Sequence, residues 1–157
     1  MTRTITRKIK RAASAGAITA MLTAAVPATA GDVIITITDM RSTKGVVRAC
    51  MTTKESIFPK CRKDPAAHRT VVQASGAANG KVTIRFTNVE PGDYAIAVLH
   101  DENNDGKANR ALGMMPKEGY GFSRDAPVRM APPKFGDAVF EYRGTDQSLT
   151  IRMRYFL

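Results

Sequence analysis

Strict alternation of apolar and polar side chains in residues 81–87 limits the fold of this 157-residue chain more than any other feature. Val82, Ile84 and Phe86 would share one face of an extended segment, and the charged or hydroxyl-bearing residues between them would share the other. A period of two with one apolar face is typical of a half-buried antiparallel strand. We therefore predict such a strand at residues 81–87.

Further strands are predicted wherever short β-branched or alternating segments lie between turn signals. These segments are residues 33–38, 46–51, 69–74, 94–99, 137–142 and 148–156. Asn79-Gly80, directly before residues 81–87, is the strongest hairpin signal. No helix is predicted beyond residue 30. About seven strands at this spacing predict an all-β fold, a single antiparallel two-sheet sandwich of immunoglobulin-like or transthyretin-like form.

Residues 108–133 show no clean periodicity, and their glycines and prolines interrupt any long helix or strand. Apolar residues, among them Leu112, Tyr120 and Phe122, are too frequent there for a solvated linker. We expect a long, irregular but ordered excursion from the sandwich.

The N-terminus has the three parts of a secretory signal peptide, a basic start, an apolar stretch at residues 12–26 and an A-x-A site at Ala28-Thr29-Ala30. Cleavage is expected after Ala30, which leaves a β-sandwich domain at residues 31–157 and the signal helix outside the fold. The alternatives are an uncleaved anchor or a transit peptide. No later segment is long and apolar enough to span a membrane. The expected location is periplasmic or secreted.

The charge of the chain changes when residues 1–30 are removed. They hold five of the 24 basic residues and none of the 14 acidic ones, so the net charge falls from +10 to +5 over the remaining 127 residues. The remaining basic residues are scattered among acidic ones rather than clustered, which argues against nucleic-acid binding.

Both cysteines, Cys50 and Cys61, follow the predicted cleavage site. In an exported chain, two cysteines most simply form one disulfide, here closing a short loop. A two-cysteine metal site is the alternative, but His68 is the one further candidate ligand nearby.

The segment after residues 94–99 has the ligand spacing of a calcium loop. Asp101, Asn103 and Asp105 alternate and Gly106 follows, which is the D-x-N-x-D-G pattern in which side-chain oxygens converge on one ion. The Lys107 carbonyl and Asn109 are further expected ligands. Leu112 occupies the position of the bidentate glutamate of an EF-hand, so the chain is not expected to contain one.

Glu118 or Glu102 could complete the ion's coordination shell. We expect weak, structural Ca²⁺ binding, with a dissociation constant on the order of 10⁻⁴–10⁻³ M. The alternative is a self-capped turn, because Asp, Asn and Gly also favour tight turns through their own hydrogen bonds.

The order and content of several motifs resemble one known family. "RACMTTKESIFPKC", "PGDYAIAVLHDENNDGK", "LGMMPKEGYGFS" and "PPKFGDAVFEY" are similar to segments of the Domain of Unknown Function 2141 family of exported bacterial proteins. The resemblance extends over essentially the whole chain after residue 30. It implies an exported small β-sandwich and supplies no activity, catalytic residue or partner.

A noncatalytic binding or envelope-associated module is the function expected first. Its ligand surface would include His100, Tyr120 and Phe122, with an envelope polysaccharide or protein as partner. Alternatively, the aromatic residues of the excursion fold back and cover an open end of the sandwich. The other hypotheses are a small periplasmic hydrolase that uses the loop carboxylates and a purely structural envelope component. No nucleophile motif is present, so an enzyme is the weaker expectation.

Overall fold

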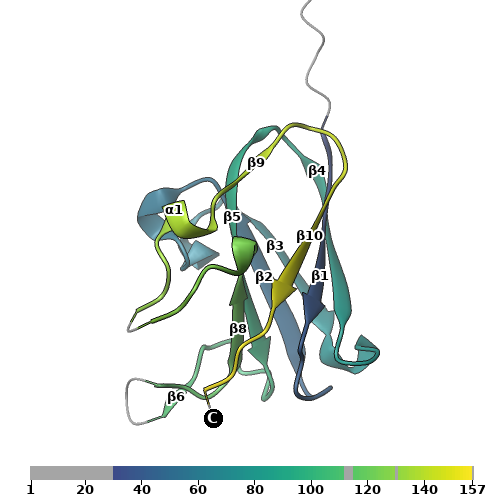
Figure 1. Cartoon of the computed structure of the whole chain (residues 1–157), viewed down its shortest axis with the longest axis vertical. Coiled ribbons are helices and arrows are strands. Elements are labelled where there is room, and N and C mark those ends of the chain that lie inside the picture. Colours follow the sequence, from purple (N-terminus) through teal and green to yellow (C-terminus); the bar gives the residue numbers. More distant parts are fainter. Residues whose placement is uncertain (1–29, 112–114, 130, 157) are drawn as a thin grey trace, which may run out of the picture.

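The computed structural model describes residues 30–111, 115–129 and 131–156. The predicted signal peptide up to Thr29 and the predicted core residue Leu112 lie outside these ranges. Within them the chain forms a two-sheet β-sandwich (Figure 1), which confirms the predicted fold class. One sheet has the strand order β10-β1-β4, from Gln147–Arg152, Gly31–Thr38 and Val82–Val89.

The second sheet is built around β5, the longest strand. Its order is β3-β2-β5-β8, from His68–Gln73, Val46–Thr52, Gly92–Asp101 and Gly119–Phe122. The short strand β9 (Phe140–Tyr142) pairs with the beginning of β5, and β8 pairs with its end. The remaining elements are β6 (Arg110–Ala111) paired with β7 (Met115–Pro116), α1 (Phe135–Ala138) and the 3-10 turns η1 (Glu55–Ile57), η2 (Cys61–Lys63), η3 (Ala74–Gly76) and η4 (Ser123–Asp125).

The core between the sheets follows from the period-two patterns. Ile84 and Phe86 of β4 are buried, as the alternation predicts, and they pack with inward residues of both sheets. The other buried members on β1, β2 and β5 are Val33, Ile35, Ile37, Val47, Ala49, Met51, Tyr94, Ile96 and Val98. Asn79 and Gly80 have φ angles of 52° and 69°, which is the two-residue turn geometry that the hairpin prediction requires.

One strand pair departs from the predicted antiparallel arrangement. β10 runs parallel to β1, with Val33 opposite Gln147 and Ile37 opposite Ile151. The chain arrives at β10 from β9, which belongs to the other sheet, so β10 enters as a crossover strand and not as the second half of a hairpin. The predicted strand 148–156 ends earlier, at Arg152. Beyond it, a single bridge between Arg154 and Tyr120 joins the two sheets at that edge.

Two predictions for the second half of the chain were incomplete. The excursion at 108–133 contains β8, whose residues 119–122 add a strand to the sheet at β5. Residues 137–142 were predicted to be one strand, but α1 occupies the first part and β9 begins at Phe140. The buried Ser123 hydroxyl explains this interruption, because it donates to the Ala138 carbonyl and accepts the Ile96 amide, which holds α1 against β5.

The described residues of the excursion from β8 onward cover the outer face of β5. Ala95 and Phe122 form a second buried cluster with residues of the later loop, and Phe58 packs edge-to-face on Phe122 and Phe135. Tyr120 packs at the margin of this cluster. The small residue Ala95 on the outer face of β5 leaves room for these rings, so both faces of β5 are buried there.

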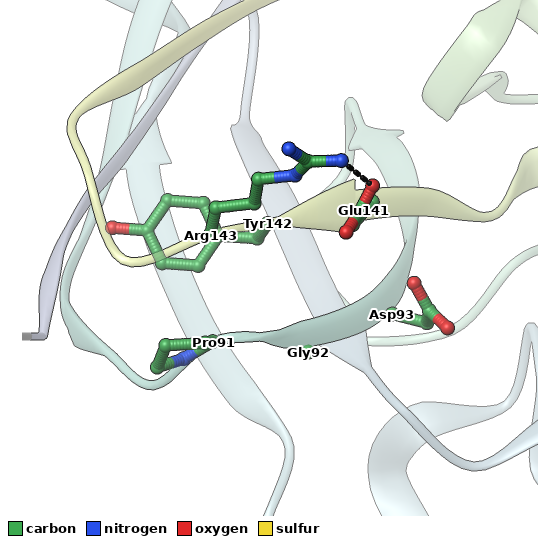
Figure 2. A pocket seen from close by; sticks show the side chains of 6 residues that line it. All are labelled: Pro91, Gly92, Asp93, Glu141, Tyr142 and Arg143. Atoms are coloured by element: carbon green, nitrogen blue, oxygen red, sulfur yellow. Dashed lines mark hydrogen bonds and ion pairs between the residues drawn. The ribbon is translucent and has the colours of Figure 1, made fainter. Parts of the chain in front are cut away.

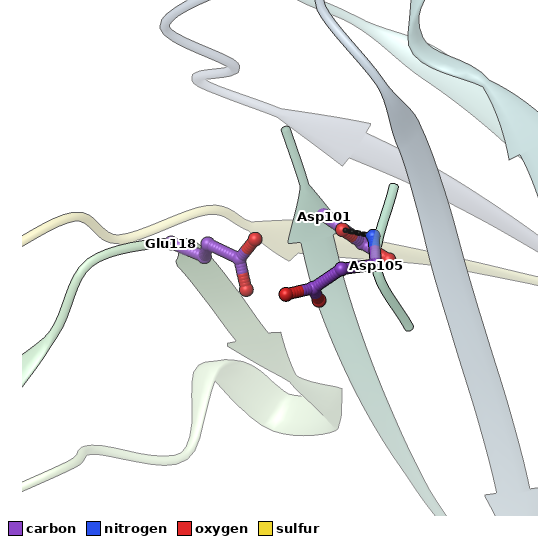
Figure 3. A group of neighbouring side chains, drawn as sticks. All are labelled: Asp101, Asp105 and Glu118. Carbon is purple, nitrogen blue, oxygen red and sulfur yellow. Dashed lines mark hydrogen bonds between the residues drawn. The ribbon is translucent and has the colours of Figure 1, made fainter. Parts of the chain in front are cut away.

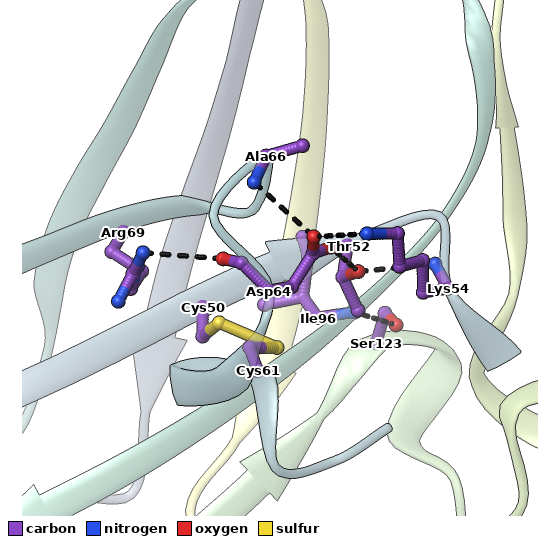
Figure 4. Close-up of a disulfide and its surroundings, with 9 residues drawn as sticks. All are labelled: Cys50, Thr52, Lys54, Cys61, Asp64, Ala66, Arg69, Ile96 and Ser123. Atoms are coloured by element: carbon purple, nitrogen blue, oxygen red, sulfur yellow. Dashed lines mark hydrogen bonds and ion pairs between the residues drawn. A yellow bond between two sulfur atoms is a disulfide. The ribbon is translucent and has the colours of Figure 1, made fainter. Parts of the chain in front are cut away.

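The predicted disulfide between Cys50 and Cys61 is present (Figure 4), with the two Cα atoms 6.0 Å apart. It fixes η2 to β2 beside Asp64, a buried carboxylate that accepts hydrogen bonds from Thr52 and Lys54. Disulfides persist in oxidising compartments outside the cytosol, so the bridge is consistent with an exported chain. In the described part of the chain, no helix combines the length and apolar character needed to cross a bilayer.

Candidate cation site at the end of β5

Three carboxylates meet where β5 ends. Asp101 is the last residue of β5, Asp105 lies four residues later in the loop, and Glu118 directly precedes β8, the neighbouring strand. One oxygen of each lies within 4.8 Å of the others, and Figure 3 shows Glu118 directed toward Asp105. Two oxygens on opposite sides of one calcium ion are separated by about 4.6–5.2 Å. The spacing therefore fits a single ion of that size.

Asp101 holds the loop in shape. It is fully buried, and its two oxygens accept the backbone amides of Asp105, at 3.1 Å, and Gly106, at 2.9 Å. Gly106 has a φ of 74°, which glycine adopts without steric cost. The glycine of the motif thus permits the turn that returns the chain toward Asp101.

Asp105 is exposed and receives hydrogen bonds from the loop around it. Its Oδ1 accepts the Lys107 amide at 2.8 Å, and its Oδ2 accepts the side-chain amides of Asn109, at 2.8 Å, and Asn103, at 3.2 Å. These bonds, with that of Asn109 the largest, lower the pKa of Asp105. Asn103, Asp105 and Asn109 are therefore together, as predicted, but both Asn side chains present N–H groups and not oxygens to the centre. This is the hydrogen bonding of a self-capped turn.

Glu118 is the carboxylate of the cluster whose hydrogen bonding the turn leaves incomplete. It is 5% exposed, its Oε2 accepts the Asn109 amide at 3.1 Å, and its Oε1 is buried without a hydrogen-bond partner among the described residues. Burial raises the pKa of Glu118, the Asn109 bond offsets part of this rise, and the charges of Asp101 and Asp105 add to it. An unpartnered buried carboxylate oxygen costs about 1–3 kcal/mol or more, so a bound cation or a proton would stabilise this arrangement.

Glu102, the other candidate for the shell, is already bound by neighbouring side chains. Arg41 binds it through two guanidinium nitrogens and Ser42 donates to it, and this hydrogen bond with Arg41 is the largest cause of its lowered pKa. Arg41 also donates to the Lys117 carbonyl at 3.0 Å. Glu102 therefore fastens the loop to its surroundings, and Glu118 is the carboxylate available to an ion.

Sequence reasoning missed Arg48. Its Nε lies 2.7 Å from Asp101 Oδ2, and its Nη2 donates to Asn104 Oδ1 at 2.8 Å. Arg48 comes from β2, 53 residues before Asp101, and reaches the loop because β2 and β5 are neighbours. Loop spacing carries no signal for such a residue. With Arg48 included, three ionised carboxylates and one guanidinium leave two negative charges, which a divalent cation would neutralise.

The predicted ligand surface divides into buried and exposed parts. His100 is fully buried, where its ring nitrogens contact the Tyr155 hydroxyl at 2.7 Å and the Lys44 carbonyl at 2.9 Å. Phe122 is 6% exposed within the second cluster. Both side chains are buried in this arrangement, and a ligand surface that includes them stays a prediction. Tyr120 is half-buried and lies beside Phe156, with ring centroids 5.5 Å apart.

A hydrolase would need a cleft beside its carboxylates. The hollow in Figure 2 is shallow and lies at the other end of β5, where Pro91, Gly92 and Asp93 face β9. A second hollow lies between β3 and β4 and is lined by residues around Arg69 and Arg85. Neither contains any of the three clustered carboxylates, so the described hollows give no support to hydrolysis at this cluster.

Comparison with known proteins gives a family and no activity. Neither the curated proteins nor the solved structures contain a match to the chain. The model of a family described as an uncharacterized protein conserved in bacteria, DUF2141, matches residues 35–150. This range includes all or part of every strand of both sheets, the disulfide and the three carboxylates. The chain belongs to the DUF2141 family.

Proposed function

We propose that this protein is an exported, noncatalytic β-sandwich module whose loop end binds a divalent cation, with Ca²⁺ as the preferred ion. The observation that carries the proposal is the buried Glu118 oxygen, which has no partner in the described structure and lies beside Asp101 and Asp105. A cation among these carboxylates would replace the missing hydrogen bond and balance their charge.

The donor set favours a hard ion. The cluster offers carboxylate oxygens and, after rotation of the side-chain amides, the oxygens of Asn103 and Asn109. Such a terminal amide torsion has broad, nearly two-fold minima, so this rotation is accessible. The Lys107 carbonyl is a further expected ligand. Oxygen ligands from an irregular loop suit Ca²⁺, because Mg²⁺ demands near-ideal octahedral geometry.

The role of the ion would be structural. It would join the end of β5 to the segment before β8, so that a loop and an edge strand are fixed to each other through Asp105 and Glu118. A disulfide and a predicted signal peptide support a periplasmic or extracellular location, where millimolar calcium is compatible with weak sites.

Calorimetric titration of the exported protein with CaCl₂ tests the proposal. We expect one ion per chain, with a dissociation constant on the order of 10⁻⁴–10⁻³ M. Asp105→Asn should lose this binding, and Asp93→Asn, an exposed carboxylate at the other end of β5, should retain it. The absence of a saturable signal at about ten times the upper limit of that range, in a protein that is folded by circular dichroism, would overturn the proposal.

A binding surface for envelope polysaccharide is a second candidate, favoured by the aromatic pair beside the cation site. Phe156 is 46% exposed and its ring tilts 35° from that of Tyr120, on the strand that follows Glu118. Aromatic residues are enriched at binding surfaces, and the Tyr120 hydroxyl adds a polar group to this pair. Retention on envelope glycans that is lost in Phe156→Ala but kept in Val71→Ala, an exposed apolar residue on β3, would support it; equal retention of both variants would exclude it.

A further inference from the structure

The first residue of β1 is built into a small polar socket. A Cβ atom on Gly31 would lie 2.6 Å from the Tyr142 hydroxyl, 3.0 Å from the Gly144 carbonyl and 3.2 Å from Asp146 Oδ1. A Cβ atom this close to the Tyr142 hydroxyl would require the buried Tyr142 side chain to shift, so the socket favours glycine at this position. Gly31 is also the residue that follows the A-x-A sequence at residues 28–30.

The Tyr142 hydroxyl in this socket is incompletely hydrogen-bonded. It is buried with no partner of normal geometry among the described residues, although the Gly31 backbone amide lies near it. In Figure 2 the phenol ring of Tyr142 extends from β9 toward the start of β1, away from the exposed side chains of Glu141 and Arg143. A buried hydroxyl that is not fully hydrogen-bonded is destabilising, so a further donor at Gly31 would be stabilising.

Negative charge surrounds the same position. Asp146 Oδ1 accepts the Asp32 amide at 3.0 Å, and the Asp32 carboxylate lies beside it, paired with Arg85 at 2.7 Å. Burial raises the pKa of the Tyr142 hydroxyl, the charge of Asp146 raises it further, the Gly31 backbone amide offsets part of this rise, and the charge of Asp32 adds to it. A peptide amide at Gly31 brings one N–H donor and no charge to this socket. An α-ammonium group brings three donors and a positive charge.

We propose that cleavage between Ala30 and Gly31 completes the fold, because the new α-ammonium group of Gly31 binds in the socket formed by Tyr142, Gly144 and Asp146. Hydrolysis of the Ala30–Gly31 peptide bond consumes one water, which leaves a carboxylate on Ala30 and the ammonium on Gly31. The ammonium donates to the Tyr142 hydroxyl and is attracted to the Asp146 carboxylate. Processing thus supplies a structural group that the uncleaved chain lacks.

The first test is the N-terminus of the exported protein. The full chain is expressed in a bacterium with an intact secretion pathway, and the mass of the recovered protein is measured. We expect a chain that begins at Gly31. A protein that begins at any other residue, or that retains Met1, would overturn the proposal.

The second test compares the processed protein with a form that carries Ala30 as one extra residue, both in chelator so that cation binding has no effect. A charge-assisted hydrogen bond stabilises the fold more than a neutral one does, and partial exposure of Gly31 reduces this gain. We expect the equilibrium constant for unfolding to be about tenfold larger with Ala30 present.

Tyr142→Phe tests whether the Tyr142 hydroxyl causes the stability difference between the two N-terminal forms, because this variant keeps the ring and removes the hydroxyl. In that background the effect of Ala30 should fall to about threefold or less. Equal stability of the two N-terminal forms with Tyr142 present would refute the socket, as would an undiminished Ala30 effect in Tyr142→Phe. Neither result depends on calcium, so failure of this inference and failure of the cation proposal are distinguishable.

Discussion

Replacing Glu118 by Gln distinguishes a cation site from a self-capped turn. Glutamine keeps the volume and an oxygen for the Asn109 amide, and it removes the charge. In chelator at neutral pH, the wild-type protein holds a buried carboxylate with one unpartnered oxygen, at a cost of about 1–3 kcal/mol. Glu118→Gln should therefore equal or exceed the stability of the wild type, by up to about 3 kcal/mol.

Calcium should stabilise the wild type more than Glu118→Gln. With a dissociation constant of about 10⁻⁴ M and 10 mM free calcium, linkage stabilises the wild type by about 2.7 kcal/mol. If loss of the charge weakens binding tenfold, the variant gains about 1.4 kcal/mol. At about 2.1 cal/mol/K of unfolding entropy per residue over the chain after Ala30, these gains raise the melting temperature by about 10 °C and about 5 °C.

Thermal unfolding followed by circular dichroism gives the melting temperatures of the wild type and of Glu118→Gln, each in chelator and in calcium. Glu141→Gln is the matched control, because its side chain is 60% exposed and lies on β9, away from the loop. Its calcium shift should equal that of the wild type. The same calcium shift in Glu118→Gln as in the wild type would refute the argument. So would a variant that is less stable than the wild type in chelator by more than about 1 kcal/mol.

Three further predictions concern the scaffold. Replacing Cys50 and Cys61 by Ala opens a loop of 11-residue separation and should cost about 3 kcal/mol in denaturant unfolding, whereas unchanged stability would show that the loop is held by other contacts. Gly121→Ala places a Cβ 2.7 Å from a β10 side chain and should cost about 1–3 kcal/mol, but Gly136→Ala, with no atom within 4 Å, should be neutral or stabilising in the same unfolding assay. Hydrogen bonds from a lysine and a threonine lower the pKa of Asp64, so its contribution to stability is present above the ordinary carboxyl pKa and is lost as pH falls through the lowered value. Asp64→Asn should therefore flatten the acid side of the stability profile, and an unchanged profile would contradict this assignment.

Local pattern predicted the parts of this fold that depend on neighbouring residues. The alternation at residues 81–87 corresponds to β4, and the Asn79-Gly80 turn closes a single bridge between Ala78 and Lys81 just before it, since strand periodicity and turn geometry are set within a few residues. The parallel pairing of β10 with β1 depends on how the chain crosses between sheets, which composition does not record. The helical turn before β9 likewise depends on the distant hydroxyl of Ser123.

The candidate site likewise has parts that local sequence predicts and parts that depend on distant contacts. D-x-N-x-D-G spacing located Asp101, Asn103 and Asp105, because the hydrogen bonds that bring these side chains together lie within the loop itself. That Glu118 and not Glu102 joins the cluster can be seen only once β8 is placed beside β5. The contribution of Arg48 can be seen only once β2 is paired with β5. The burial of His100 also follows from tertiary packing, since its partner Tyr155 lies 55 residues further along the chain.

Chemical-shift mapping by ¹H–¹⁵N NMR tests the central claim most directly, because it reports both the ion and its position. Addition of calcium to the exported protein should move the backbone amides of Asp105 to Lys107 and the side-chain amides of Asn103 and Asn109 along one saturable curve, as those amides turn their oxygens toward the ion. Signals from β3 should stay in place. Loop signals that remain unchanged to 10 mM calcium, a hundredfold above a dissociation constant of about 10⁻⁴ M, would contradict the account and leave a turn closed by its own hydrogen bonds.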